Sequence, residues 1–283
     1  MADDRWRMAE MGQLRARLVV PCALLLLLLL FAWIGPVVFG VDPDAMDLAQ
    51  TVAGASAVHP LGTDESGRDV LARLMVGGRV SLAVGLFATA VALGVGTLAG
   101  ALAGWKGGRT DQVVMRVTDA AMAVPAFFVA LAVLTIFGSR LPLLVVVIAA
   151  TSWMGIARLV RAEVASLRER EFVMAARALG RPGVGIFVRH LLPHLVPTLS
   201  VAASVGVAWA ILTESALSFL GLGVQPPGAS WGNMLTGAQN YLYTAPRLAV
   251  WPGLMILLTT LASNGLGEAL RRGTGTPSGT PTI

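Results

Sequence analysis

The sequence contains one cysteine, Cys22, among its 283 residues. An internal disulfide, or a zinc cluster held by cysteines, needs more than one thiol, so both are excluded. Charged residues are also scarce, since Asp, Glu, Lys and Arg make up 13% of the chain, against about 25% in ordinary soluble domains. With 55% hydrophobic residues, this composition argues against a water-soluble fold.

Lysine is nearly missing, because Lys106 is the only one among 21 basic residues. A phosphate-binding P-loop ends in Gly-Lys-Ser/Thr, whereas Lys106 lies in Gly-Trp-Lys-Gly. We therefore expect that this chain is not an enzyme and that it does not hydrolyse ATP through that motif. His190 and His194 have the spacing of a zinc-protease helix. However, Leu191 replaces the general base and Pro193 is expected to interrupt the helix, so no metal site is predicted.

Long uncharged windows fill much of the sequence, and about 20 apolar residues suffice to cross the hydrocarbon core of a bilayer. These windows predict an all-α integral membrane protein with six transmembrane helices, at residues 18–40, 80–105, 120–139, 141–157, about 195–220 and 248–267. The first is interpreted as an uncleaved anchor, because no small-x-small cleavage site follows it.

The basic residues are distributed unevenly between the predicted loops, and cytoplasmic segments retain positive charge. With both termini inside, 16 of the 21 basic residues are cytoplasmic, and five are external: Arg68, Arg73, Arg79, Arg140 and Arg247. This topology explains the net charge of +5, so no nucleic-acid partner is expected.

The predicted organisation follows from these spans. It comprises a cytoplasmic N-terminal segment (1–17), the first transmembrane helix (18–40), an external loop (41–79), a five-helix core (80–272) and a tail (273–283). The core includes a cytoplasmic loop at 158–194 and an external loop at 221–247. The tail is rich in Gly, Thr and Pro and is predicted to be disordered.

Ionisable side chains within the spans are functional candidates, because a charge in hydrocarbon is costly. For Asp119, an ion pair with Arg116 is the favoured interpretation. For Glu214, a hydrogen bond to a neighbouring helix and a pore-lining position are both open. Candidate pathway-lining residues are Thr213, Glu214, Ser215 and Ser218.

Gly96, Gly100 and Gly104 recur every four residues in the second span. They form a flat stripe on which another helix can approach closely. The stripe suits packing within the chain and a dimer contact equally well.

The main cytoplasmic loop carries a helix stop signal. The segment from Arg158 to Leu179 alternates charged and small apolar residues, and Gly180 follows it, with Pro182 two positions later. A second short helix is expected from Val184 to Leu191. Two short helices joined at such a break make a compact projection that suits a groove on a soluble partner.

These residues resemble the EAA loop of permease subunits of ABC importers, through Ala175-Ala176, Gly180 and Leu192-Pro193 at the family's spacing. Met174 stands where the pattern has Glu, and His190 where it has Ile. Glu171, one turn earlier, is a candidate for the missing carboxylate. The ATPase-coupling residues that the resemblance indicates are Glu171, Ala175, Ala176, Arg177, Gly180, Leu192 and Pro193. Of these, Ala175 and Ala176 are expected to form the contact surface, and Gly180 to set the angle of the break.

Three further segments, 59–70, 214–235 and 251–271, resemble the second permease of dipeptide, oligopeptide and nickel importers. The first holds an external-loop motif of Gly62, Thr63, Asp64, Gly67, Arg68 and Asp69. We expect this motif to form a hydrogen-bonded turn rather than to contact substrate.

The resemblance implies a subunit of a binding-protein-dependent importer in the bacterial inner membrane. Its expected partners are membrane lipid, a homologous second permease, two cytoplasmic ABC ATPases and an extracytoplasmic substrate-binding protein. The chain itself would bind no cofactor, with ATP and Mg held by the ATPases. The cargo implied is a dipeptide or oligopeptide, and the alternative is nickel, glutathione or another small solute.

Two other classes of membrane protein are alternatives to this interpretation. A secondary transporter needs coupling-ion sites near the midplane and commonly two related halves, and neither is evident in the sequence. A non-transporting membrane scaffold fits the composition but leaves the ordered family segments unexplained.

Overall fold

The computed structural model describes residues 2–273, with side chains described for 18–272. Of the predicted tail at 273–283, all residues after Gly273 lie outside the described range. Within the described residues the regular structure is helical apart from one isolated antiparallel bridge between Thr63 and Asp69. The all-α fold is therefore confirmed. The helices are α1 (Ala2–Trp33), α2 (Gly35–Phe39), α3 (Val70–Lys106), α4 (Gly108–Met122), α5 (Ala126–Phe137), α6 (Leu141–Leu167), α7 (Glu171–Ala178), α8 (Gly183–Ile186), α9 (Leu192–Phe219), α10 (Trp231–Ala238) and α11 (Arg247–Gly273), with short turns at Leu48–Gln50, Phe187–Leu191 and Gln239–Tyr241.

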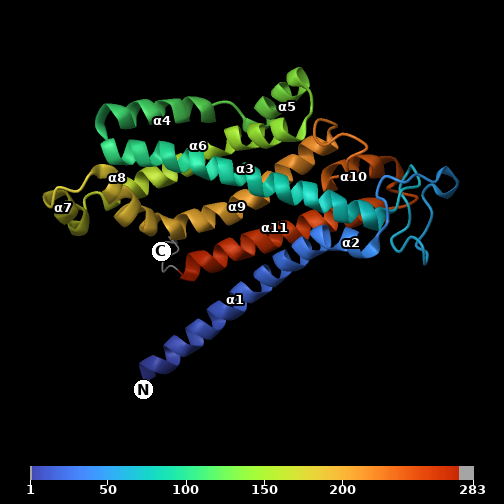
Figure 1. Ribbon diagram of the computed structural model, residues 1–283, viewed down its shortest axis with the longest axis horizontal. Coiled ribbons are helices and arrows are strands. Elements are labelled where there is room, and N and C mark those ends of the chain that lie inside the picture. Colours follow the sequence, from blue (N-terminus) through green and yellow to red (C-terminus); the bar gives the residue numbers. More distant parts are fainter. Residues whose placement is uncertain (1, 274–283) are drawn as a thin grey trace, which may run out of the picture.

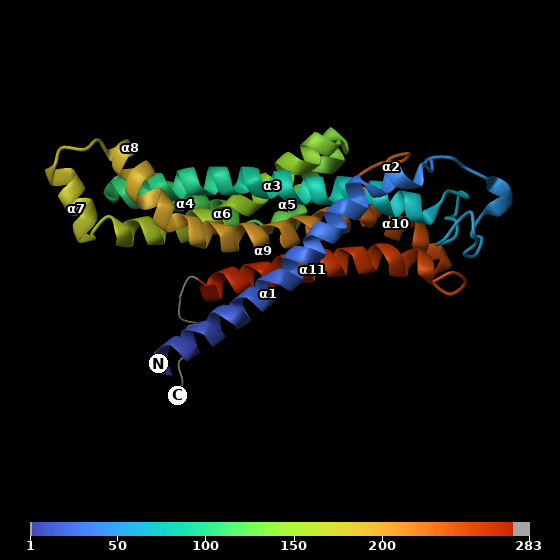
Figure 2. The same cartoon turned by 60° about the horizontal axis from the view of Figure 1, so that its bottom comes forward.

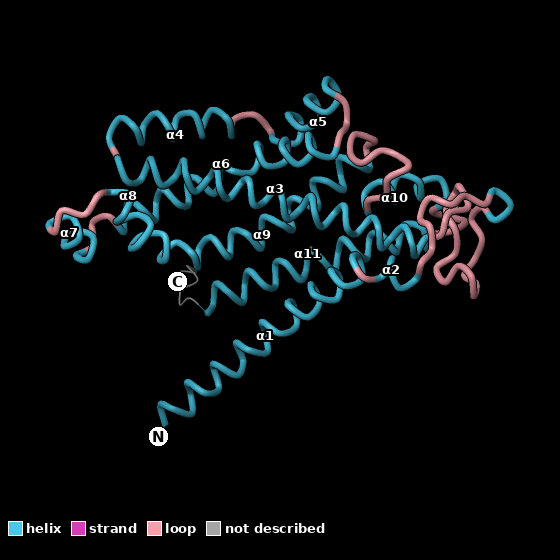
Figure 3. Tube along the Cα trace, in the orientation of Figure 1, coloured by secondary structure: helices cyan, strands magenta, loops and turns pink. Residues whose placement is uncertain are grey.

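The long helices form an elongated bundle (Figure 1). Helices α3, α6, α9 and α11 run along its length, and α1 crosses them obliquely (Figure 2). Helix α7 lies at one end, whereas α10 and most of the loop residues gather at the other (Figure 3). We call these the α7 end and the loop end. The start of α1 and the end of α11 both lie in the half of the bundle that contains α7 (Figure 1).

Four helices in the described chain are long and apolar enough to cross a membrane: α3, α6, the continuous Gly183–Phe219 helix and α11. The α4 and α5 pair is a fifth candidate, and Leu18–Trp33 of α1 is apolar but shorter. The structure thus supports a multi-pass membrane protein, while the count of six spans stays a prediction.

The third predicted span, 120–139, is not one straight helix. Helix α4 ends at Met122 inside that window, and α5 leaves it at an angle of 74°. Pro125 lies at the break and has an extended backbone (ψ 119°). A proline also disfavours the helical conformation of the residue before it, which interrupts the helix here. Helix α4 is attached to α6 by two ion pairs, Asp111 with Arg161 and Asp119 with Arg158. The favoured pairing of Asp119 with Arg116 was therefore wrong.

Two helices extend beyond their predicted boundaries. Helix α3 begins at Val70 rather than near residue 80, because the Asp69 side chain caps it by accepting from the backbone N–H of Ala72 at 2.8 Å. The predicted loop 41–79 therefore ends at Asp69. Helix α6 continues to Leu167, ten residues past the predicted boundary at 157.

The glycine stripe packs α3 against α6 within the chain. A Cβ at Gly96 would lie 2.7 Å from Cβ of Ile156, and one at Gly104 would lie 2.7 Å from the carbonyl oxygen of Arg161. At Gly100 the carbonyl oxygen of Ala157 is closer still. The absence of side chains thus lets two backbones touch along several turns, which settles the stripe as an intrachain contact.

Candidate functional site

The external-loop motif folds into one hydrogen-bonded turn at the loop end. Asp64 Oδ1 accepts from the backbone N–H groups of Ser66 at 2.8 Å and Arg68 at 2.9 Å. Thr63 Oγ1 accepts from the N–H of Ala53 at 2.8 Å and donates to the carbonyl of Gln50. The turn expected from the sequence is therefore present.

The remaining motif residues fix the turn to its surroundings. Asp69 Oδ2 lies 2.8 Å from His59 Nδ1. Gly62 and Gly67 both have positive φ, at 80° and 73°, where a side chain would be strained. At Gly67 a Cβ would also collide with the backbone of Asp47. All six residues of the motif thus have a structural reason in this turn.

A buried ionic cluster joins this turn to α3. Asp64 Oδ2 lies 3.3 Å from Arg68 Nε and 3.4 Å from Arg73 Nε. Arg73, in the first turns of α3, also lies 3.4 Å from Asp44 and from the carbonyl oxygen of Pro227. Arg73 was not among the predicted site residues, because the sequence pattern placed it in a loop. The capping signal of Asp69 before the apolar run would have placed it on the helix.

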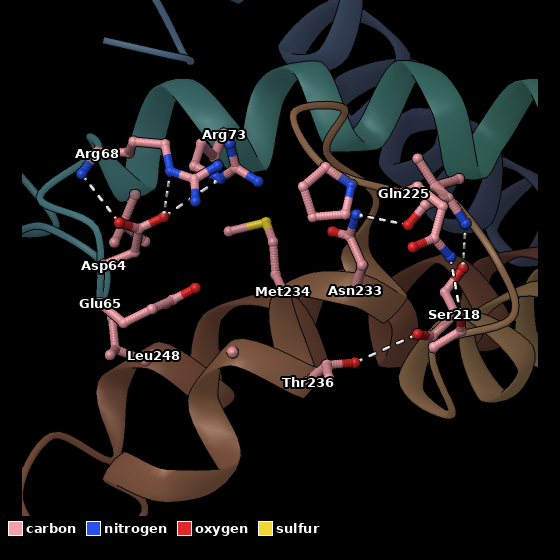
Figure 4. Close-up of a pocket in the computed structure, with 15 residues that line it drawn as sticks. Asp64, Glu65, Arg68, Arg73, Ser218, Gln225, Asn233, Met234, Thr236 and Leu248 are labelled. Atoms are coloured by element: carbon pink, nitrogen blue, oxygen red, sulfur yellow. Dashed lines mark hydrogen bonds and ion pairs between the residues drawn. The ribbon is translucent and has the colours of Figure 1, made fainter. Parts of the chain in front are cut away.

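The cluster borders a cavity of about 250 Å³ at the loop end. Figure 4 shows Asp64, Arg68 and Arg73 on the side of α3, and Asn233, Met234 and Thr236 on α10. The Asn233 amide donates to the carbonyls of Val224 and Gly228, so it holds the 221–230 loop rather than facing a ligand freely. The cavity therefore lies where the loops and α10 are tied together.

We expect Asp64 and Arg68 to be energetically coupled. In a double-mutant cycle with Asp64→Asn and Arg68→Gln, the coupling should be about 0.5–3 kcal/mol in unfolding free energy, because the two buried groups lose their mutual contact, while Asp64 keeps Arg73 and Arg68 keeps Ser66 as a partner. Denaturant unfolding in detergent measures it. A cycle of Asp42→Asn with Arg68→Gln is the control, since Asp42 is exposed and bonds to the N–H of Asp44 instead. Additive effects of the two changes in the first cycle would show that the Asp64–Arg68 ion pair does not contribute to the stability of the turn.

Glu214 lies at the contact of three helices and is fully buried. Its carboxylate oxygens accept from Ser81 Oγ of α3 at 2.9 Å and from Ser218 Oγ of α9 at 2.7 Å. Ser81 Oγ in turn accepts from the backbone N–H of Trp231 at the start of α10 at 3.2 Å. Of the two interpretations left open, the hydrogen-bonded one is observed.

The four predicted pathway residues differ in their burial and contacts. Glu214 and Ser215 are buried in helix contacts, and their role in the pathway stays a prediction. Ser218 is also buried but borders the cavity of Figure 4. Thr213 is half-buried and donates to the carbonyl of Trp209 at 2.9 Å, and its pathway role stays a prediction.

Replacing Glu214 by leucine should destabilise the fold. Ser81 and Ser218 would each lose a buried acceptor, and an unsatisfied buried hydroxyl costs about 1–3 kcal/mol. Glu214→Gln, which keeps one acceptor oxygen, should lie between the leucine variant and the wild type. The midpoint of thermal unfolding in detergent checks the order. A leucine variant with the wild-type midpoint would show that the network contributes nothing to stability.

We call residues 170–192, at the α7 end, the knob. Helix α7 ends in a Schellman motif: the N–H of Gly180 donates to the carbonyl of Arg177 at 2.9 Å, and that of Arg181 to the carbonyl of Ala176 at 3.2 Å. Gly180 has φ 73°, the left-handed conformation that this motif requires. The predicted stop is therefore confirmed.

The knob is anchored to the bundle on one face. Val173 and Ala176 are buried in a cluster with Val160, Val164 and Ile186. The Arg177 guanidinium lies 4.4 Å from the ring centroid of Trp105 at the end of α3. Ala176 was expected to form part of the contact surface, but it packs inward, whereas Ala175 is exposed.

The outer face of the knob carries large exposed apolar side chains among its charged residues. Phe172, Met174, Leu179 and Val184 are all exposed, the last two by 80% and 77%. Glu171, at the start of α7, is exposed as well. Such a patch on a projection is typical of a docking surface.

The helix is continuous through Pro193, contrary to expectation. A π-helical turn at Phe187–Leu191 precedes it, in which the N–H of Leu192 donates to the carbonyl of Phe187. This extra residue in the turn lets α8 run into α9, and Pro193 falls at the first positions of α9, where its missing N–H is tolerated. The Phe172 ring of α7 stacks on His194 at 5.1 Å.

The fold and these sites define a multi-pass membrane protein with the knob at one end and hydrogen-bonded loops at the other. Residues 96–274 match the family model described as "Binding-protein-dependent transport system inner membrane component". The chain belongs to this family of ABC importer permeases. It is therefore a permease subunit of a binding-protein-dependent importer, and the ATPase of such a transporter lies on separate chains.

Individual relatives agree with this assignment. The chain is 39% identical to the nickel transport system permease protein NikC of Escherichia coli K12, covering 95% of this chain and 94% of the relative. It is 36% identical to the oligopeptide transport system permease protein OppC of Haemophilus influenzae, covering 90% and 82%. In fold it is similar to a chain of the inward-facing MetNI methionine ABC transporter, with a TM-score of 0.56 at 18% identity over 69% of this chain and 94% of that one.

Proposed function

We propose that this permease serves an importer of dipeptides or oligopeptides and forms half of the translocation pathway with a homologous second permease. Two ABC ATPases, which hold ATP and Mg, bind at the α7 end through the knob of each permease. A substrate-binding protein docks at the loop end. The supporting relative is the oligopeptide permease, and nickel is the alternative cargo because the nickel permease is at least as similar, at 39% identity against 36%.

The observation that carries this proposal is the position of the knob. It lies at the opposite end of the bundle from the tied loops (Figures 1 and 3). The long helices that join the two ends are the same helices that anchor it, since its buried face packs on Val160 and Val164 of α6 and its Arg177 on Trp105 of α3. A displacement of the knob is thus transmitted to α3 and α6 rather than absorbed by a loose linker.

The mechanism follows from that attachment. Closure of the ATPase dimer on ATP brings the two knobs together, and each knob carries its bundle between inward-open and outward-open arrangements. The exposed apolar side chains of the knob enter the ATPase groove, with Ala175 on the same surface. Glu171 supplies a carboxylate beside Met174.

The proposed orientation places the α7 end in the cytoplasm of a bacterial cell, in the inner membrane. The start of α1 and the end of α11 lie in the same half of the bundle as α7 (Figure 1), so both termini would be cytoplasmic. The distribution of arginine supports the same orientation.

Transport by reconstituted proteoliposomes tests the proposal. The vesicles contain this chain, its sister permease and the paired ATPases, with ATP inside and the binding protein with labelled peptide outside. Uptake that requires both ATP and this chain supports the peptide importer. ATP hydrolysis stimulated by the binding protein without peptide uptake would redirect the cargo to nickel or another solute. Uptake driven by a proton gradient without ATP would favour a secondary transporter, and loss of all activity in a verified assembly would favour a scaffold.

A further inference from the structure

A second cavity, of about 340 Å³, lies between α3, α6 and α9. Its lining comes from near the middle of each of the three helices, away from both the knob and the loop end. Every described residue that lines it has an uncharged side chain: Ala88, Thr89, Ala92, Thr151, Ser152, Gly155, Ile156, Leu159, Ala202, Val205, Gly206, Trp209 and Ala210. We call this the midspan cavity.

Three hydroxyl groups give the midspan cavity its polarity. Ser152 Oγ donates to the carbonyl of Ile148 at 2.7 Å, and Thr151 Oγ1 to the carbonyl of Val147 at 3.0 Å. Because their protons are used within α6, both oxygens are left as acceptors. The two hydroxyls can therefore receive hydrogen bonds from N–H or O–H groups of a solute.

Thr89 of α3 differs from these two. It is only 4% exposed, and its Oγ1 is buried without a hydrogen-bond partner among the described residues. It faces Gly206 of α9, where an added Cβ would lie 2.8 Å from Thr89 Cγ2. A buried hydroxyl without a partner is unfavourable, so a ligand or water that enters the cavity has a reason to bind there.

The opposite face of α3 has a different character. Phe87 and Leu98 point away from Thr89 by the helical repeat, and they are exposed by 60% and 72%. Large apolar side chains of this kind suit lipid, whereas hydroxyls and glycines beside a cavity suit a passing solute.

We propose that the midspan cavity is the segment of the pathway contributed by this chain, and that it accepts peptide cargo by hydrogen bonds from amide and ammonium N–H groups to Thr89, Thr151 and Ser152. This inference rests on the proposed function, since the cavity is only one wall until the second permease faces it. Selection there depends on N–H donors and not on a charged side chain of this wall.

The single native cysteine makes an accessibility test practical. In a Cys22→Ser background, Ser152→Cys should react several-fold faster with a charged, membrane-impermeant methanethiosulfonate than Phe87→Cys, which points away from the cavity on the opposite face of α3. Peptide-loaded binding protein with ATP should slow the reaction of Ser152→Cys alone. Equal reactivity of the two thiols in a transporter that imports peptide would overturn the inference while the proposed function stands.

The hydroxyl of Thr89 provides the second arm. Thr89→Val removes it at constant shape and should lower the rate of trialanine uptake about fivefold, the effect of one hydrogen bond of about 1 kcal/mol. Thr89→Ser keeps the hydroxyl and should therefore retain clearly more uptake than Thr89→Val. Unchanged uptake by the valine variant would overturn the role of Thr89. Failure of the wild-type assembly to import any peptide would overturn the proposed function, and this inference with it.

Discussion

Replacing Gly180 with valine is expected to abolish uptake while the chain still inserts and folds in the membrane. Gly180 has φ 73°, and an added Cβ would meet nothing within 4 Å. The only obstacle is therefore the backbone conformation, which is costly for an L-residue and most of all for a β-branched one. The valine backbone would leave the left-handed region, and the hydrogen bonds from Gly180 and Arg181 that close α7 would be lost.

Gly180→Asn is the matched control, because asparagine adopts the left-handed conformation far more readily than valine. It should retain most of the uptake, whereas Gly180→Val should retain little at equal expression and equal thermal midpoint. ATP hydrolysis by the assembled transporter should lose its stimulation by the binding protein in the valine variant alone. Normal transport by Gly180→Val would show that coupling does not depend on the left-handed backbone at Gly180, which sets the angle of the knob.

The features that could be predicted from the sequence, a helix end and a turn, depend on interactions between residues close together in the chain. A helix end is encoded within a few residues, so Gly180 followed by Pro182 was sufficient to place the end of α7. The turn around Asp64 is equally local, because its side chain bonds to backbone groups two and four residues away. Asp69 belongs to the same kind of signal, although its capping role was not recognised.

Contacts between distant segments could not be predicted in this way. Asp119 pairs with Arg158, 39 residues away, instead of Arg116 on its own helix. The hydrogen bond from Ser81 to Glu214 joins residues 133 positions apart. Ala176 is buried because α6 and α8 meet at its face of α7, and the residue type does not distinguish it from exposed Ala175.

Pro193 shows a different limit. Its effect on a helix depends on the hydrogen-bond register of the preceding turn, and the π-helical turn at Phe187–Leu191 has no simple sequence signal. The midspan cavity was missed for a related reason. Thr89, Ser152 and Gly206 come from three separate helices, and only their packing brings them together.

Replacing Gly100 with valine is expected to have the largest effect on folding. Its Cβ would lie too close to the carbonyl oxygen of Ala157, 2.9 Å from Cβ of Val160 and 3.0 Å from the backbone nitrogen of Arg161. Overpacking a core by side chains alone typically costs about 1–3 kcal/mol. Here the obstacle includes the backbone of α6, which cannot rotate away, so α3 and α6 must separate.

Gly94 is the control on the same helix, since an added Cβ there would meet nothing within 4 Å. Gly94→Ala should be neutral or stabilising by up to about 1 kcal/mol through helix propensity. Size-exclusion chromatography and thermal unfolding after detergent extraction compare the two variants. Gly100→Val should aggregate or unfold at a much lower temperature, and an unchanged midpoint would mean that the α3 and α6 contact is not closely packed. Because α6 carries Val160 and Val164 beneath the knob and Thr151 and Ser152 at the midspan cavity, a looser contact at Gly100 should disturb coupling and transport together.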